Sequence, residues 1–426
     1  MDKIALKNKI RALEGLTNDE KAALLELLNK QKKYGLVWED KPEDVEERLR
    51  DELPVLKEVK ERFIASDDPE APNHVLIEGD NLEALTALTY THAGKIDVIY
   101  IDPPYNTGNK DFVYNDSFVD SEDSFRHSKW LSFMNKRLKL AKGLLSDKGV
   151  IFISIDDNEQ AQLKLLCDEV FGSSNFIADV IWQHSIQPKG YLGSFSLHHN
   201  YTLVYKKTES FVLGNLERTE EDNKAYKNPD NDPRGRWRSG DVRNALYRPN
   251  LIFDIKTPSG KIIHAPEKGW RWSKETIREK MQTGEIVFNK DETNIIRKIY
   301  LDTVEGRCPE TIWFGKEVGT TREANADLKD LFNGKSPFDT PKPIRLLNRI
   351  MIVGGNKNST ILDFFAGSGT TLHATMQLNA EDGGHRKCIL VTNNENNICE
   401  EVTYERNKRV INGYTTPKGD KVEGLN

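Results

Sequence analysis

One carboxylate, two prolines and an aromatic ring stand together at Asp102-Pro103-Pro104-Tyr105. The mostly apolar run before them, 97–101, predicts a buried strand that ends at this acid. Proline has no N–H and cannot continue a strand ladder, so both proline carbonyls stay free to accept a hydrogen bond. An acid, a free carbonyl and a flat ring suit a planar group with an exocyclic amine, such as a nucleobase. Taken alone, these residues also fit a proline-rich turn.

A second group of candidate residues lies near the other end of the chain. Residues 359–365 predict a strand, residues 366–371 (Ala-Gly-Ser-Gly-Thr-Thr) the turn after it, and a helix starts at Leu372. Glycines at such a turn let a ligand approach the backbone, and the free N–H groups of the helix can hold its polar end. Glu395 follows a further predicted strand, where an acid can bind a ribose diol. The third glycine of the dinucleotide fingerprint is missing, which favours a nucleoside without a pyrophosphate.

The elements that must position these residues alternate between strand and helix. Residues 74–78 predict a strand that is followed by a turn and a helix with leucines at helical spacing. The next strand ends at Asp102, and two strands joined by a helix predict a parallel sheet with its site at the carboxyl ends. Asp80, just past the first strand, would share that edge, either as a helix cap or as a ligand.

Further predicted elements extend the same sheet. They are a helix at 124–145, strands at 150–155, 178–182 and 201–205, and a helix from 156 to 172. We therefore predict an α/β protein with a doubly wound, mostly parallel Rossmann-like sheet. The predicted domains are a helical N-terminal segment (1–70), a first core part (71–208), an insert (209–335) and a second, cofactor-binding core part (336–426).

The N-terminal segment and the insert differ in character from the core. Thr17 and Glu20 have capping-box spacing, and an apolar stripe follows over 22–28. The insert lacks the strand and helix alternation and brings arginines close to aromatic rings; these arginines are Arg234, Arg236, Arg238, Arg243 and Arg248. Such a mixture fits phosphate and base contacts, or equally arginines that stack on rings within a small fold of their own.

Composition limits the class of protein. The chain has 426 residues, of which 30% are charged, and a mean hydropathy of −0.63. These values predict a soluble protein of two or three domains, with no apolar run that could span a membrane and no signal peptide. Its four cysteines are scattered, which indicates a reducing cytoplasm and neither a zinc site nor disulfides. The net charge of −6 restricts any nucleic-acid surface to a local patch.

The two motifs together carry a family resemblance. The aspartyl-diproline-tyrosine motif, placed before the Phe365-x-Gly367-x-Gly369 motif, resembles amino-group DNA methyltransferases of the permuted β type. Three further segments resemble the modification subunits of type III restriction-modification systems: 105–108, 112–118 and 154–159. The resemblance covers about residues 70 to 420. Such subunits commonly continue beyond the equivalent of Asn426, so the chain is expected to be a short or truncated member.

The resemblance implies roles for the candidate residues. Asp102, Pro103, Pro104 and Tyr105 would be catalytic, with Tyr105 stacking on the target base and Tyr201 or His199 forming a second wall. A second set of residues would bind S-adenosylmethionine: Asp80, Lys342, Asp363, Phe365, Gly367, Gly369 and Glu395. In this set, Lys342 would lie near the carboxylate of the cofactor and Glu395 would accept the ribose hydroxyls. The insert would be the target-recognition domain on double-stranded DNA, and no metal is implied.

The resemblance implies transfer of a methyl group to the N6 amine of an adenine flipped out of duplex DNA. The cytosine N4 amine fits the same acceptors, but the aspartate before the prolines favours adenine. A homodimer and a separate restriction subunit with helicase and nuclease activity are expected from the likeness alone. Two alternatives stay open: an RNA or protein methyltransferase with the same core, and a DNA-specificity subunit without catalysis of its own.

Overall fold

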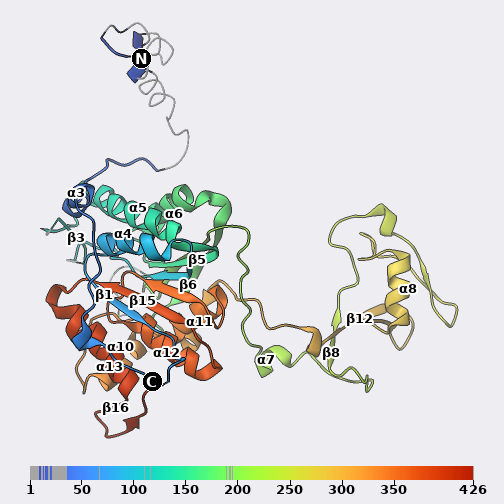
Figure 1. Ribbon diagram of the computed structural model, residues 1–426. Helices are drawn as coiled ribbons and strands as arrows, with labels where there is room; N and C mark the ends of the chain where they lie inside the picture. Colours follow the sequence, from blue (N-terminus) through green and yellow to red (C-terminus); the bar gives the residue numbers. More distant parts are fainter. Residues whose placement is uncertain are drawn as a thin grey trace. The chain divides into compact units, whose positions relative to one another are not determined.

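The computed structural model describes residues 9, 10, 13, 15–17, 20, 21, 36–66, 68–109, 111–115, 117–188, 190, 193 and 195–425 (Figure 1). The chain divides into two compact units. The core unit comprises Met1–Leu213 and Glu310–Asn426, and the insert unit comprises Gly214–Pro309. Each unit is described by itself below. Among the helices that the structure describes, none combines the length and apolar character that crossing a bilayer requires.

The core unit is built on an eight-stranded sheet. From one edge to the other, its strands are β1 (Val75–Glu78), β15 (Lys387–Thr392), β14 (Thr360–Asp363), β2 (Ile96–Ile101), β5 (Leu145–Ile155), β7 (His199–Lys206), β6 (Phe176–Gln183) and β13 (Ile312–Trp313). Every neighbouring pair is parallel except the two pairs that involve β7. The predicted α/β class with a mostly parallel sheet is confirmed.

The central strands are apolar along almost their whole length because helices cover both faces of the sheet. One layer contains α4 (Asn81–His92), α5 (Arg126–Leu144) and α6 (Gln160–Cys167), and the opposite layer contains α10 (Thr321–Leu331), α11 (Ile344–Gly354), α12 (Thr370–Asp382) and α13 (Glu405–Asn412) (Figure 1). Strands β14 and β15, from the C-terminal part of the chain, lie between β1 and β2 in the sheet. The two strands of the predicted strand-helix-strand unit are therefore not neighbours.

The boundary of the insert differs from the one predicted. Residues 310–335 belong to the core unit, since β13 pairs with β6 through Ile312 with Ile181 and Trp313 with Trp182. Trp313 is buried there, and α9 (Gly315–Val318) and α10 follow it. A two-residue strand has no periodicity that a sequence could reveal. The insert unit therefore ends at Pro309, ahead of the predicted boundary at 335.

The insert unit has a small hydrophobic core of its own. It contains α7 (Glu220–Asn223), β8 (Trp237–Gly240), β9 (Ile255–Lys256), β10 (Ile262–Ile263), α8 (Lys274–Gln282), β11 (Ile286–Phe288) and β12 (Ile295–Tyr300). Strands β11, β12 and β8 form an antiparallel sheet. Trp270 and Ile277 are buried together with isoleucines from β9 to β12. Such a cluster explains why this stretch, poor in long apolar runs, is compact.

Shorter elements lie at the periphery of the core unit. They are α3 (Asp44–Asp51) and the strand pairs β3 (Val113–Tyr114) with β4 (Ser117–Phe118) and β16 (Tyr414–Thr415) with β17 (Lys421–Val422). The predicted capping box is present, as the Glu20 carboxylate accepts the Thr17 N–H at 2.7 Å and the Thr17 hydroxyl accepts the Glu20 N–H at 3.3 Å. The predicted apolar stripe over 22–28 lies outside the described residues.

Candidate active site

A cavity of about 1410 Å³ opens at the carboxyl ends of the core strands. Both predicted motifs line it, although they lie at opposite ends of the sequence; the lining includes Asp80, Asp102, Pro103, Pro104, Tyr105, Lys342, Asp363, Phe365, Gly367 and Glu395. This is the edge at which parallel sheets bind ligands, because helix N-termini and strand-end loops converge there. The cavity is large enough for two organic guests side by side.

Asp102 leaves the end of β2 with two oxygens in different surroundings. Oδ2 accepts a hydrogen bond from the Lys342 ammonium. Oδ1 is buried and has no hydrogen-bond partner among the described residues. The side chain as a whole is 25% exposed, so Oδ2 is the oxygen that can meet a ligand. The carboxylate oxygen of Asp102 that is available to the cavity is thus already in contact with the Lys342 ammonium.

The two proline carbonyls differ in their hydrogen bonding. The indole Nε1 of Trp130, a fully buried residue of α5, donates a 2.8 Å hydrogen bond to the Pro104 carbonyl. No hydrogen bond to the Pro103 carbonyl occurs in the part of the chain that the structure describes. The prediction that both carbonyls stay free is therefore wrong for Pro104, because a helix distant in sequence supplies a donor. Pro103 retains an acceptor within the lining of the cavity.

Tyr105 is half-buried beside this acceptor pair. Its hydroxyl is enclosed, and burial together with the nearby charge of Asp102 raises the pKa of Tyr105 well above its ordinary value. The Lys342 Nζ lies 5.4 Å from the centre of its ring. A neutral ring with its polar end held inside the protein presents a flat apolar surface to the cavity.

A buried network fixes the loop that follows. Asn106 has a φ of 57°, in the left-handed region, and its amide donates a 2.5 Å hydrogen bond to Glu159. His127 Nδ1 lies 2.6 Å from the same carboxylate. Burial raises the pKa of Glu159, although both hydrogen bonds oppose that shift. Sequence reasoning assigned Glu159 to the start of a predicted helix and to the family resemblance, and this supporting role of Glu159 was missed.

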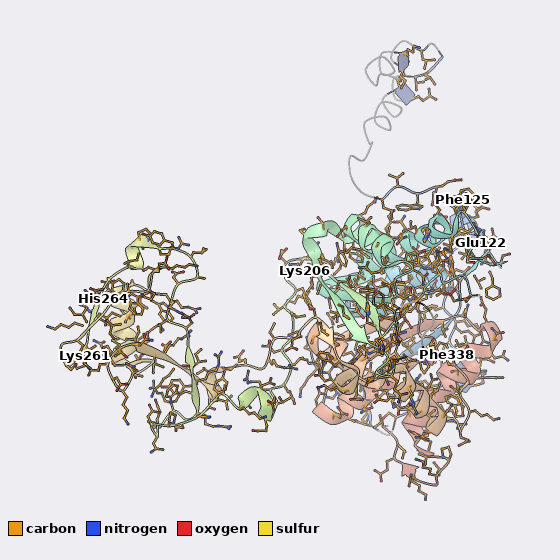
Figure 2. The ribbon with its side chains drawn as sticks, turned by 180° about the vertical axis from the view of Figure 1, so that it is seen from behind. Glu122, Phe125, Lys206, Lys261, His264 and Phe338 are labelled. Atoms are coloured by element: carbon orange, nitrogen blue, oxygen red, sulfur yellow. The ribbon has the colours of Figure 1, made fainter. Side chains whose placement is uncertain are left out.

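The buried carboxylate of Asp363 stabilises the glycine turn at residues 366–369. This carboxylate accepts the Phe365 N–H at 3.0 Å and the Thr371 hydroxyl at 2.5 Å. Burial raises the pKa of Asp363 to about 7. Gly367 has a φ of 50°, and an added Cβ would lie 3.1 Å from the ring of Phe338, which is labelled in Figure 2. A side chain at position 367 would therefore be strained in its backbone and crowded against Phe338.

Gly369 has a different reason to be glycine. It precedes α12 with a φ of 75°, and an added Cβ would lie 2.5 Å from the Asn407 amide nitrogen. Gly369 is absent from the lining of the cavity. Glycine is required at this position by the backbone conformation and by packing against α13. The geometry gives no support for a direct contact between Gly369 and a ligand, which the fingerprint implies.

The two remaining predicted acids differ sharply. Glu395 is exposed at the cavity and its side chain makes no hydrogen bond within the described part of the chain. Asp80 caps α4, since its Oδ1 accepts the Leu82 N–H at 2.7 Å, and its Oδ2 lies 3.5 Å from Arg137. The helix-cap interpretation of Asp80 is thus confirmed, while a ligand role stays a prediction.

Arg137 is a site residue that sequence reasoning missed. It is buried in α5 and binds Glu43 at 2.9 Å and the Asn81 side chain at 2.5 Å. Its guanidinium carbon lies 3.5 Å from the centre of the Phe133 ring. Together these contacts join the N-terminal segment to the strand ends. A charged residue on the apolar face of an amphipathic helix was the available signal.

Of the two proposed second walls, His199 lines the cavity and Tyr201 does not. The Tyr201 hydroxyl instead donates to Asp157 at 2.9 Å. Trp182, which sequence reasoning assigned only to a strand, also lines the cavity.

The candidate arginines of the insert unit fall into two groups. Arg234 is bound to Asp232 and to the carbonyls of Thr283 and Gly284. Arg238 donates to the Tyr226 hydroxyl at 3.0 Å, and Arg243 is paired with Asp241. Arg236 and Arg248 are exposed, and their guanidinium groups have no partner among the described residues. The guanidinium carbons of Arg234 and Arg238 also lie 4.5 Å from the centre of the Tyr300 ring and 5.6 Å from the centre of the Tyr226 ring, so the stacking alternative holds for these two.

The comparisons with known proteins agree with this geometry. Residues 96–405 match the family model described as DNA methylase. The chain is 38% identical over 347 residues to the type III restriction-modification enzyme StyLTI Mod subunit of Salmonella typhimurium, covering 75% of this chain and 52% of that protein. It is 34% identical to the EcoPI Mod subunit of Escherichia phage P1, covering 76% and 58%.

A shorter relative is matched over most of its length. The type II methyltransferase M.KpnI of Klebsiella pneumoniae is 35% identical over 363 residues, covering 79% of this chain and 84% of that protein. Against the two Mod subunits, the chain spans only a little more than half of the relative's length.

Proposed function

The chain belongs to the DNA methylase family, and from this premise we propose that it is a site-specific DNA methyltransferase. The proposed reaction moves a methyl group from S-adenosylmethionine to the N6 amine of an adenine flipped out of duplex DNA, within a restriction-modification system. The names of the similar proteins, Mod subunits and a type II methyltransferase, support this class of reaction.

One observation carries the proposal: Asp102 and the unpaired Pro103 carbonyl line the same cavity as the glycine turn and Glu395. The lone pair of an aromatic amine is delocalised into its ring, so the amine is a poor nucleophile. Two acceptors that each bind one N–H draw the nitrogen toward a tetrahedral geometry and expose the lone pair. Asp102 and Pro103 provide such acceptors, and neither a cysteine nucleophile nor a metal is needed for this step.

The residues of the glycine-turn side fit the proposed cofactor. Glu395 lines the cavity, and its carboxylate has no partner among the described residues, which leaves it available to bind a ribose diol. Gly367 and Phe365 line the adjoining wall, next to the ring of Phe338. Asp363 lines the cavity, and both oxygens of its carboxylate accept hydrogen bonds from the turn and from Thr371. When bound, S-adenosylmethionine supplies an electrophilic sulfonium methyl group.

The target base must leave the duplex to reach this cavity, since its amine is paired and stacked in DNA. Tyr105 offers a flat surface on which the base can stack, and His199 lines the same cavity. Adenine and cytosine amines both suit the acceptors. The aspartate at Asp102 favours adenine through the family likeness, and cytosine N4 is the alternative that product analysis must decide.

The insert unit is the proposed target-recognition domain. It contains 19 lysines and arginines against 16 aspartates and glutamates, whereas the whole chain has a net charge of −6. Positive charge is thus concentrated in this unit, as phosphate binding requires. Of the five candidate arginines, Arg236 and Arg248 are exposed and have no partner among the described residues, so they are the ones proposed to contact DNA. A homodimer and a separate restriction subunit are proposed from the family likeness.

One assay tests the proposal against its rivals. The purified chain is incubated with methyl-labelled S-adenosylmethionine and, in parallel, duplex DNA, RNA or protein, and the labelled product is hydrolysed and identified. We expect N6-methyladenine from duplex DNA alone. N4-methylcytosine would change the target base, whereas label in RNA or protein, or DNA binding without label, would overturn the proposal.

A further inference from the structure

Lys342 lies where the target amine is expected. Its ammonium contacts Oδ2 of Asp102, the oxygen that faces the cavity, while Oδ1 is buried out of reach. The same ammonium lies 5.4 Å from the centre of the Tyr105 ring and 6.0 Å from the centre of a Trp182 ring. It therefore covers both the acceptor that the amine needs and the ring on which the base would stack.

An ammonium and a target amine cannot use this oxygen equally well. Both are donors, and a cation on Oδ2 withdraws the negative charge that makes Asp102 a strong acceptor. The side chain of Lys342 is only 10% exposed, so the cation has little access to solvent on its own. Methyl transfer through Asp102 is consequently favoured when the ammonium finds another acceptor.

The backbone around Lys342 is more restricted than its side chain. Pro341 and Pro343 flank it, and Pro343 is the residue before α11. Prolines restrict the backbone on both sides, whereas the lysine side chain has four rotatable bonds. The positive charge of Lys342 also lowers the pKa of Asp363, against the stronger effect of burial. The ammonium is thus within electrostatic reach of the glycine turn as well as of Asp102.

We propose that Lys342 is a positioning residue that couples cofactor binding to entry of the target base. Its ammonium holds Asp102 until the amino-acid carboxylate of the cofactor offers a second anionic partner beside the glycine turn. When the ammonium moves to that carboxylate, Oδ2 of Asp102 becomes free and the ring of Tyr105 is uncovered. The target base therefore enters the cavity once the cofactor is bound. This inference rests on the proposed function and adds an order of binding to it.

Base entry can be measured without turnover. The methylation site is first mapped by sequencing DNA modified by the wild-type protein, and a duplex is then made with 2-aminopurine, which fluoresces on unstacking, at the target position. Sinefungin retains the cofactor's amino-acid carboxylate but has no methyl group to transfer, whereas methylthioadenosine lacks the amino-acid part. We expect sinefungin to raise the extrahelical fraction about fivefold or more and methylthioadenosine to leave it unchanged, within the usual range of coupling between two sites.

Variants separate the role of the ammonium from that of the fold. Lys342→Met retains the aliphatic stem and removes the charge, so the base should enter to the same extent with either ligand or with neither. Lys316→Met makes the same change at an exposed lysine of α9 outside the cavity lining, and it should behave as the wild type. The ligand comparison on the wild type tests the inference even where Lys342→Met fails to fold.

Three results would overturn the inference. They are equal base entry in the wild type with and without sinefungin, an equal effect of methylthioadenosine, and sinefungin dependence that persists in Lys342→Met. Failure of the proposed function would look different, because the wild-type protein would then leave no methylated site in DNA to map.

Discussion

Replacing Asp363 by asparagine should change how stability depends on pH. Asparagine has the same shape, and its amide can still meet the Phe365 N–H and the Thr371 hydroxyl, but it carries no ionisable proton. In the wild type, burial raises the pKa of Asp363 from its ordinary value of 3.8 to about 7. The folded protein therefore holds this proton over a pH range in which the unfolded chain has released it.

The sign of the effect follows from that difference. A carboxyl group whose folded pKa is raised stabilises the protein below its unfolded pKa, and the contribution is lost as pH rises through its folded pKa. With folded and unfolded pKa values of about 7 and 3.8, the wild type should lose about 2–3 kcal/mol of unfolding free energy between about pH 5 and pH 8 through this one group. Asp363→Asn should lack that loss.

Urea unfolding of the complete chain at pH 5, 6, 7 and 8 measures the difference, and the transition of the core unit is followed by near-ultraviolet circular dichroism. Subtracting the variant's pH profile from that of the wild type cancels the groups they share. Thr371→Val supplies a second check, because removing a hydrogen bond that lowers the pKa of Asp363 should shift the loss to higher pH. Parallel profiles of wild type and Asp363→Asn would refute the reasoning.

Four further outcomes are expected. Asp102→Ala should reduce methyl transfer by about 10²–10³-fold or more while calorimetry finds no loss of cofactor affinity; substantial residual turnover would contradict the mechanism. Glu395→Ala should weaken cofactor binding about tenfold or more, as loss of a charged hydrogen-bond acceptor predicts, and unchanged affinity would exclude its role. Glu159→Gln should lower both thermal stability and kcat, since the buried network under the catalytic loop loses its charge; an effect on neither would show the network to be dispensable. Arg248→Ala should reduce DNA affinity and its salt dependence at unchanged melting temperature, whereas Arg234→Ala should lower the melting temperature; the reverse pattern would overturn the division of the arginines.

The strand pattern of the core was predictable because its strands are buried on both faces. A continuous apolar run such as 150–155, bounded by turn signals and too short for a typical helix, is characteristic of a buried strand, and the structure contains β5 there. The same logic located β14 and β15 and the turn between β14 and α12. By contrast, β13 has two residues, and no local pattern could assign it to the core or place the end of the insert.

The chemistry of the site was predictable in its parts and not in its contacts. Asp102, the proline carbonyls and Glu395 could be found because each follows a strand, where the topology of a parallel sheet brings polar groups to one edge. That Trp130 binds the Pro104 carbonyl and leaves Pro103 unpaired depends on how α5 packs over the loop. Such a contact could not be predicted, because in the sequence Trp130 looks like any other core residue of a helix.

The sequence by itself determined which elements form and which residue types stand at their ends, because hydrophobic periodicity and turn residues act over a few positions along the chain. Only the tertiary structure decided that β14 and β15 lie between β1 and β2, and that Lys342, from the distant residues before α11, contacts Asp102. Such contacts arise from long-range burial of apolar surface, which brings residues together irrespective of their separation in the sequence.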